Sequence, residues 1–305
     1  MEIREALEQY DGDVIFYYGG ISRAGYSKIC DLLEEKKEKS TKVCLIPATY
    51  GGDPDAAFRI ARAIGHHYEV VEVLIVDHCK SAGTLLCIGA DRLIFGNRGE
   101  LGPLDIQLSK PDEMFESISG LAIAQALSAI ETQMLGSFQS YWISIRNGAR
   151  LRTKLAADIA AKLVESLLSP ISARIDPMTL GEHQRAMQVA FDYGERLAAR
   201  SKNLRPDGLL RIVRDYPSHG FVIDRAEARE IFNVVDSPSG PTQIFYEAAR
   251  RAIDDGAFSG EPWVFDLANL KSPDEPESTQ QSDQMPQEEE QDSDIDKQDD
   301  NGAAT

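Results

Sequence analysis

Short apolar runs alternate with amphipathic stretches over residues 14–95, and this alternation restricts the fold more than any other feature of the chain. The apolar runs have the length and the β-branched or aromatic content of strands, and they lie at residues 14–18, 43–46, 71–76 and 92–95. Between them, residues 26–33 and 56–64 repeat apolar side chains at helical spacing. Strands that alternate with helices form a parallel sheet with helices on both faces and right-handed crossovers. The sequence therefore predicts an α/β fold built as a spiral of βαβ units.

Beyond residue 114 the pattern becomes helical. Apolar side chains recur at helical spacing over residues 118–142, 152–168 and 178–199, which predicts long additional helices. Asp224 is expected to cap one more helix, at residues 225–232. We expect three parts, namely a main domain at residues 1–236, a C-terminal helical extension at residues 237–270 and a tail at residues 271–305.

Most of the negative charge belongs to that tail. Residues 271–305 hold twelve acidic side chains and two lysines, so they carry −10 of the total net charge of −18. The tail has almost no large apolar side chains to offset the entropy of ordering it, which predicts disorder. Nucleic acid is not an expected partner of so acidic a chain.

The remaining composition indicates a cytoplasmic protein that does not enter a membrane. The N-terminus has no basic segment followed by an apolar stretch, and nowhere do 18 apolar residues follow one another. The four cysteines show no C-x-x-C spacing and lie on apolar segments, so we expect buried free thiols in a reducing compartment. No metal site is expected. No cofactor is expected either, because no G-x-G-x-x-G loop follows a strand.

Ser81 stands where a buried strand turns into a helix. The first N–H groups of a helix have no intrahelical partners and carry the positive end of its dipole, so such a turn can present a hydroxyl beside an anion site. Gly51 and Gly52 follow the preceding strand and permit close backbone approach, and Ala82 follows Ser81 directly. A nucleophile with a backbone oxyanion hole is one interpretation. The alternative is that Ser81 only caps the helix and that Gly51-Gly52 is only a tight turn.

The motifs ATYGGDP at residues 48–54, CKSAGT at residues 79–84 and LGPLDIQ at residues 101–107 resemble the ClpP/crotonase superfamily. The resemblance is to the serine dehydrogenase proteinase (SDH, SppA-like) family, and it extends over residues 14–235. It implies a crotonase-type spiral and a serine peptidase that cleaves peptides or unfolded segments without a nucleotidase activity of its own. It also implies that Ser81 is the nucleophile and that Gly51, Gly52 and Ala82 frame the oxyanion hole.

The general base departs from the family pattern. A ClpP-type protease has a histidine on a strand downstream of the nucleophile, where this chain offers Asp105. An SppA-like enzyme uses a lysine farther downstream, but residues 121–133 contain none. His219 is the first candidate, since its ordinary pKa suits proton transfer at neutral pH. Asp105 could orient that base. The other candidates are Lys154, Lys110, Lys80 and a residue from a neighbouring subunit.

Two further functions stay open. An oxyanion hole could act on an acyl-CoA thioester, as in crotonase relatives, or the chain could be a non-catalytic oligomeric scaffold that has lost its base. Residues 121–142 are apolar on more than one side, which predicts a homo-oligomer in either case.

Overall fold

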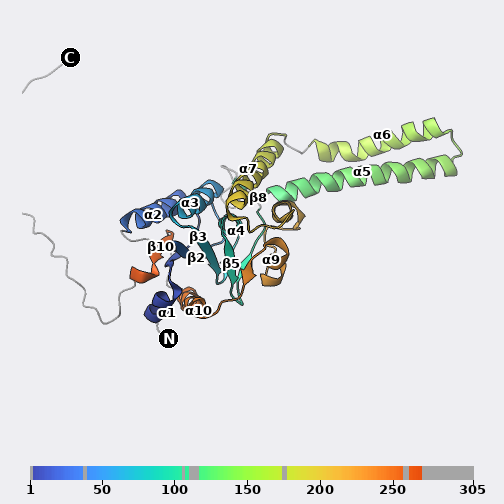
Figure 1. Cartoon of the computed structure of the whole chain (residues 1–305). Coiled ribbons are helices and arrows are strands. Elements are labelled where there is room, and N and C mark those ends of the chain that lie inside the picture. The colour runs from blue at the N-terminus through green and yellow to red at the C-terminus, as the bar shows by residue number, and fades with distance from the viewer. Residues whose placement is uncertain are drawn as a thin grey trace, which may run out of the picture. The chain divides into compact units, whose positions relative to one another are not determined.

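The computed structural model describes residues 3–36, 40–104, 107–109, 117–173, 177–256 and 261–269 (Figure 1). One compact unit spans Met1–Leu270. The acidic tail, and with it the prediction that the tail is disordered, lies outside the described residues.

A six-stranded sheet forms the centre of the compact unit, in the order β10-β1-β2-β3-β5-β9. Its strands are β1 (Asp13–Tyr18), β2 (Lys42–Ala48), β3 (Val70–Ile75), β5 (Arg92–Phe95), β9 (Val235–Asp236) and β10 (Trp263–Asp266). Neighbouring strands are parallel, except that β10 pairs antiparallel with β1. The predicted α/β fold with successive βαβ units is confirmed.

Helices cover both faces of this sheet, because alternate side chains of each strand point to opposite sides. On one face, α2 (Arg23–Glu35), α3 (Pro54–His67) and α4 (Ala82–Ile88) bury apolar side chains against strand residues such as Leu45 and Val73. On the other face, α1 (Ile3–Tyr10) and α10 (Pro241–Asp254) pack against residues such as Phe16 and Ile46. The two cores hold the strand ends, and the loops that follow them, in fixed positions.

A second pair of short strands extends from the carboxyl end of the main sheet. The strand β4 (His78–Cys79) pairs parallel with β6 (Glu100–Leu101), and Thr49 bridges to Cys79. A further hairpin consists of β7 (Gln107–Ser109) and β8 (Ser117–Ser119). The helix that we expected from residue 118 therefore begins after β8.

The long helices predicted from the second half of the chain are present as α5 (Gly120–Gly148), α6 (Thr153–Ser172) and α7 (Pro177–Ser201). The helices α5 and α6 lie side by side (Figure 1). Across the contact, α6 buries residues spaced four apart, Ala156, Ala160, Val164 and Leu168. The helix α7 packs on α3 and α4 and also contacts α5.

The last part of the compact unit returns to the sheet. After α8 (Gly208–Leu210) and a π-helical turn at Arg211–Asp215, the helix α9 (Arg225–Ile231) begins with Asp224 as its cap. As predicted, the Asp224 carboxylate accepts a hydrogen bond from the Glu227 N–H (2.9 Å). Residues 237–270, expected to be a helical extension, contain the helix α10 but also supply the edge strand β10. The expectation did not include β10, because β10 pairs with β1, which lies far away in the sequence, and such a pairing leaves no local pattern.

Candidate active site

Ser81 has a backbone conformation that few residues other than glycine adopt. Its φ is 50° and its ψ is −115°, between β4 and the first residue of α4. Its side chain makes no capping hydrogen bond to α4. By contrast, Ser22 caps α2 with an extended backbone (φ −150°, ψ 169°), and its hydroxyl accepts from the Gly25 N–H (3.2 Å). Ser81 is therefore held in a sharp turn that capping does not explain.

The glycine loop after β2 lies directly against Ser81. A Cβ at Gly51 would stand 2.8 Å from the Ser81 Cβ and 3.2 Å from its Oγ. Gly51 also has a φ of 113°, so both its conformation and its surroundings require glycine. A Cβ at Gly52 (φ 143°) would stand 2.2 Å from the carbonyl oxygen of Ile21, where the loop pairs with the segment after β1. The structure thus brings together the two motifs that the sequence singled out.

Backbone N–H groups around Ser81 differ in what they already bind. The Gly51 N–H donates to the Thr49 hydroxyl (3.0 Å). The hydrogen bonds between described residues do not engage the Gly52 N–H. Ala82 is the first residue of α4, so its N–H has no intrahelical acceptor. The Gly51 N–H is thus engaged within its own loop, and the predicted oxyanion hole of Gly51, Gly52 and Ala82 stays a prediction.

Hydrogen bonds of Thr84 hold the turn on the side of α4. The Thr84 hydroxyl donates to the Gly102 carbonyl (2.7 Å) and accepts from the Gly102 N–H (3.3 Å). These bonds tie the first turn of α4 to the LGPL segment after β6. Direct hydrogen bonds thus join the CKSAGT and LGPLDIQ motifs.

The two neighbours of Ser81 on β4 have other roles. The Lys80 amine pairs with the Glu100 carboxylate (3.0 Å), and its side chain is buried beside Gly102.

The Cys79 thiol lies in the core, 3.8 Å from the thiol of Cys87. Burial raises the pKa of Cys87, and the neighbouring Cys79 thiol raises it further. All four cysteines of the chain are free thiols. Cys79 is fully buried in the apolar core, out of reach of a substrate, so it does not fit the role of a nucleophile.

His219, the first candidate for the base, lies in a turn next to the second sheet. Four residues farther on, Ile223 exchanges two backbone hydrogen bonds with Leu101 (2.9 and 3.0 Å), and Leu101 pairs with Cys79. Through β6, the segment after His219 is therefore joined to β4, the strand that leads into Ser81. Its ring is half-buried, and Nδ1 is shielded from solvent. His219 as the base stays a prediction.

Asp105, predicted to orient the base, and Lys110 both lie outside the described residues. Lys154 stands exposed in the first turn of α6.

An aromatic pair beside the glycine loop was not recognised from the sequence. The ring of Tyr50 stacks on the imidazole of His78, with centroids 3.8 Å apart and an interplanar angle of 15°. Burial lowers the pKa of His78, although the carboxylates of Asp77 and Glu100 act to raise it. The imidazole is therefore neutral at pH 7. Alternation along β4 indicated that His78 points away from Ser81, but no local pattern relates His78 to Tyr50.

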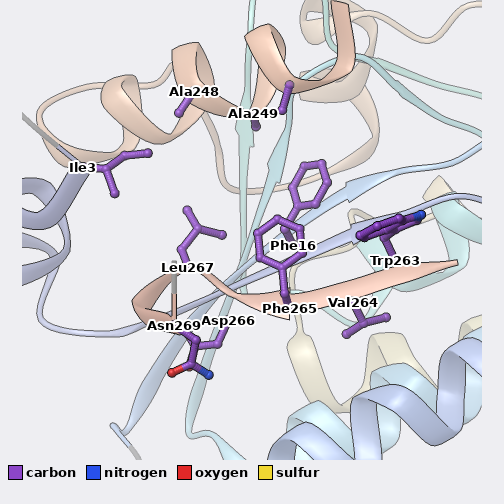
Figure 2. A pocket seen from close by; sticks show the side chains of 11 residues that line it. Ile3, Phe16, Ala248, Ala249, Trp263, Val264, Phe265, Asp266, Leu267 and Asn269 are labelled. Atoms are coloured by element: carbon purple, nitrogen blue, oxygen red, sulfur yellow. The ribbon is translucent and has the colours of Figure 1, made fainter. Parts of the chain in front are cut away.

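A cavity of about 570 Å³ lies elsewhere, between α10 and the sheet edge (Figure 2). Figure 2 shows Phe16, Phe265 and Trp263 on one side and Ala248 and Ala249 of α10 on the other. The cavity is lined mainly by apolar side chains and includes no residue of the Ser81 turn.

The described residues contain no group of three or more histidine, cysteine or acidic side chains that could hold a metal ion. Within the same residues, every helix is too short or too polar to cross a membrane.

Comparison with known proteins gives limited matches. No family model matches the chain. Over 72 residues the chain is 36% identical to the uncharacterized protein MJ0137 of Methanocaldococcus jannaschii. That match covers 24% of this chain and 25% of the relative, so the chain spans about a quarter of the length of the curated relative it matches.

Similar solved structures include a variant of the 1510-N membrane-bound stomatin-specific protease and a putative enoyl-CoA hydratase/isomerase from Mycobacterium abscessus. The first is 14% identical with a TM-score of 0.32, over 48% of this chain and 67% of that one. The second is 15% identical with a TM-score of 0.24, over 61% of this chain and 88% of that one.

Proposed function

We propose that the chain is a serine hydrolase of the ClpP/crotonase superfamily, with SDH-type peptidase activity that does not need ATP. The observation that carries the proposal is the conformation of Ser81, at φ 50° and ψ −115°, on a strand-to-helix turn against Gly51. Strained backbone at a nucleophile is a recurrent way of presenting a hydroxyl to a substrate. The surrounding core holds this conformation in place.

In the proposed reaction, the Ser81 Oγ attacks the carbonyl carbon of a peptide bond while the base takes the hydroxyl proton. The N–H groups of Gly52 and Ala82 donate to the carbonyl oxygen as it becomes negative. The base returns the proton to the leaving amine. In the second step the base takes a proton from water, which attacks the ester carbonyl carbon, and then returns the proton to the Ser81 Oγ as the acid leaves. His219 is the proposed base, with Asp105 as its orienting group and Lys154 as the alternative.

Labelling with a fluorophosphonate tests the nucleophile. Ser81→Ala is expected to abolish labelling while the protein stays folded. Ser22→Ala is the matched control, because Ser22 is a true helix cap: it should label normally but lose about 1 kcal/mol of stability. Undiminished labelling of Ser81→Ala would show that Ser81 is not the nucleophile.

The two alternative functions predict different results. A crotonase-like enzyme would turn over acyl-CoA thioesters equally well with Ser81→Ala, since only the oxyanion hole is needed. A scaffold would neither label nor turn over either class of substrate. His219→Gln should slow labelling by roughly 10²- to 10⁴-fold if His219 is the base.

The proposal includes a homo-oligomer. Residues spaced four or eight apart on α6 expose apolar side chains beside the stripe that packs on α5, at Leu155, Leu163, Leu167 and Ile171. A helix that is apolar on two adjacent faces needs a second partner. Sedimentation of the intact protein should show an oligomer, and Leu163→Lys with Leu167→Lys should dissociate it. Monomeric wild-type protein at micromolar concentration would refute this part of the proposal.

A further inference from the structure

The cavity between α10 and the sheet edge arises because α10 changes from large to small side chains along its inner face. In the first half of the helix, the rings of Phe245 and Tyr246 are buried in the core. Farther along, the cavity wall is made by Ala248, Ala249 and Ala252, whose methyl groups are too short to fill the space. The cavity of about 570 Å³ that results is far larger than the voids of a packed core, which rarely exceed the size of a water molecule.

The opposite wall of the cavity is aromatic (Figure 2). Side chains alternate along β10, so that Phe265 packs with the core beneath α10, whereas Val264 packs with the core on the other face of the sheet. Phe16 of the neighbouring strand lies beside Phe265, with ring centroids 5.2 Å apart. Phe265 is only half-buried, and 47% of Trp263 is exposed. Aromatic surface is therefore available to a molecule that enters the cavity.

The lining offers no charge that an ionic ligand could pair with. None of the described residues around the cavity is cationic. The acidic residue among them, Asp266, is 3% exposed, and its carboxylate pairs with Lys36 and accepts a hydrogen bond from the Ala268 N–H (3.0 Å). A charged group would lose its hydration here without gaining a partner. The cavity therefore favours an uncharged molecule.

We propose that this cavity is a binding site for an uncharged aromatic small molecule, held between the rings of Trp263 and Phe265 and the alanine side of α10. Its volume lies in the range of small-molecule sites, about 300–1,000 Å³. Aromatic ligands gain from offset or edge-to-face contacts with aromatic side chains, and the alanines opposite leave the room that a ring system needs. The inference does not depend on Ser81, because the cavity shares no residue with the Ser81 turn.

Two fluorescent probes with the same rings and different charge test the inference on the full chain. N-phenyl-1-naphthylamine is uncharged, and 1-anilinonaphthalene-8-sulfonate adds one negative charge to the same ring system. Both probes emit more strongly in apolar surroundings. The uncharged probe should bind saturably, with one molecule per chain, and the sulfonate should bind at least about tenfold more weakly.

Tryptophan fluorescence locates the bound probe. The chain has two tryptophans, and Trp142→Phe leaves Trp263 as the remaining one. The uncharged probe should quench the emission of Trp263 by energy transfer, with the same concentration dependence as its own gain in fluorescence.

Variants of both walls test the position of the site. Ala252→Phe fills the space from the side of α10 and should weaken binding of the uncharged probe at least about tenfold. Ala199→Phe is the matched control, since it adds the same ring at an exposed position of α7 outside the lining, and it should bind the probe as the wild-type protein does. Trp263→Ala removes part of the aromatic wall at an exposed position, so it should also weaken binding even if Ala252→Phe does not fold. Urea unfolding and sedimentation check the fold and the size of each variant.

The inference would be overturned if the wild-type protein bound neither probe saturably, if it bound both equally well, or if Ala252→Phe and Trp263→Ala bound the uncharged probe as tightly as the control. Dissociation of an oligomer by Ala252→Phe would show that a second copy of the chain covers the cavity, and would overturn a small-molecule site. Binding to Phe258→Ala but not to the wild-type protein would overturn it too, because Phe258, which lies outside the described residues between α10 and β10, would then be the occupant.

Discussion

Gly51→Ala tests whether the contact between the glycine loop and Ser81 controls the reactivity of the serine. Gly51 has a φ of 113°, and an added Cβ would stand 2.8 Å from the Ser81 Cβ, 3.2 Å from its Oγ and 3.2 Å from the Lys80 carbonyl oxygen. The substitution therefore strains the backbone of the loop and at the same time pushes on the side chain that we propose as the nucleophile.

Both effects have an expected size. A non-glycine residue in this region of φ costs roughly 1–3 kcal/mol, which should appear in the free energy of unfolding. Ordinary contacts begin near 3.4 Å, so the Ser81 Cβ must yield by about 0.6 Å. A misplacement of about 1 Å in a catalytic group lowers rates by roughly 100-fold, so labelling of Ser81 should slow by about 10- to 100-fold.

The measurement is the rate of fluorophosphonate labelling, followed by mass spectrometry, with urea unfolding of the same samples. Gly20→Ala is the matched control, because Gly20 lies in the loop after β1, has no positive φ, and an added Cβ there would have no atom within 4 Å. It should label at the wild-type rate with almost unchanged stability.

The reasoning would be refuted if Gly51→Ala labelled as fast as the wild-type protein with the same free energy of unfolding. A loss of stability without a loss of labelling would refute only the contact with Ser81, because the backbone strain would then be confirmed by itself.

Three further predictions concern the same region. Ser81→Gly should be about 1 kcal/mol more stable than Ser81→Ala, since glycine tolerates φ 50° better, and urea unfolding measures the difference. The free energy of unfolding should fall as the pH drops below 6.5, by at most about 1.4 kcal/mol per pH unit from His78, because the unfolded chain protonates this imidazole while burial keeps it neutral in the folded state. His78→Gln should remove that share of the pH dependence. The thiols of Cys79 and Cys87 should react with a thiol reagent only on unfolding, in contrast to half-buried Cys30.

Elements with a strong local pattern were predictable from the sequence. The strands β1, β2, β3 and β5 are short apolar runs bounded by polar residues, and the helices α5 to α7 repeat apolar residues at helical spacing. The Asp224 cap was predictable for the same reason, since capping involves residues only three apart. Helix α6 continues through Pro170, however, because packing on α5 outweighs the local preference of proline.

By itself, then, the sequence determined the α/β class, the position of Ser81 between a strand and a helix, and the small residues around it, since all of these depend on neighbours in the chain. Only the tertiary structure decided that β10 forms the sheet edge, that Gly51 touches Ser81, and that Tyr50 stacks on His78. Each of these depends on segments that meet through packing of the two cores, and the strained φ of Ser81 persists because those contacts outweigh its cost.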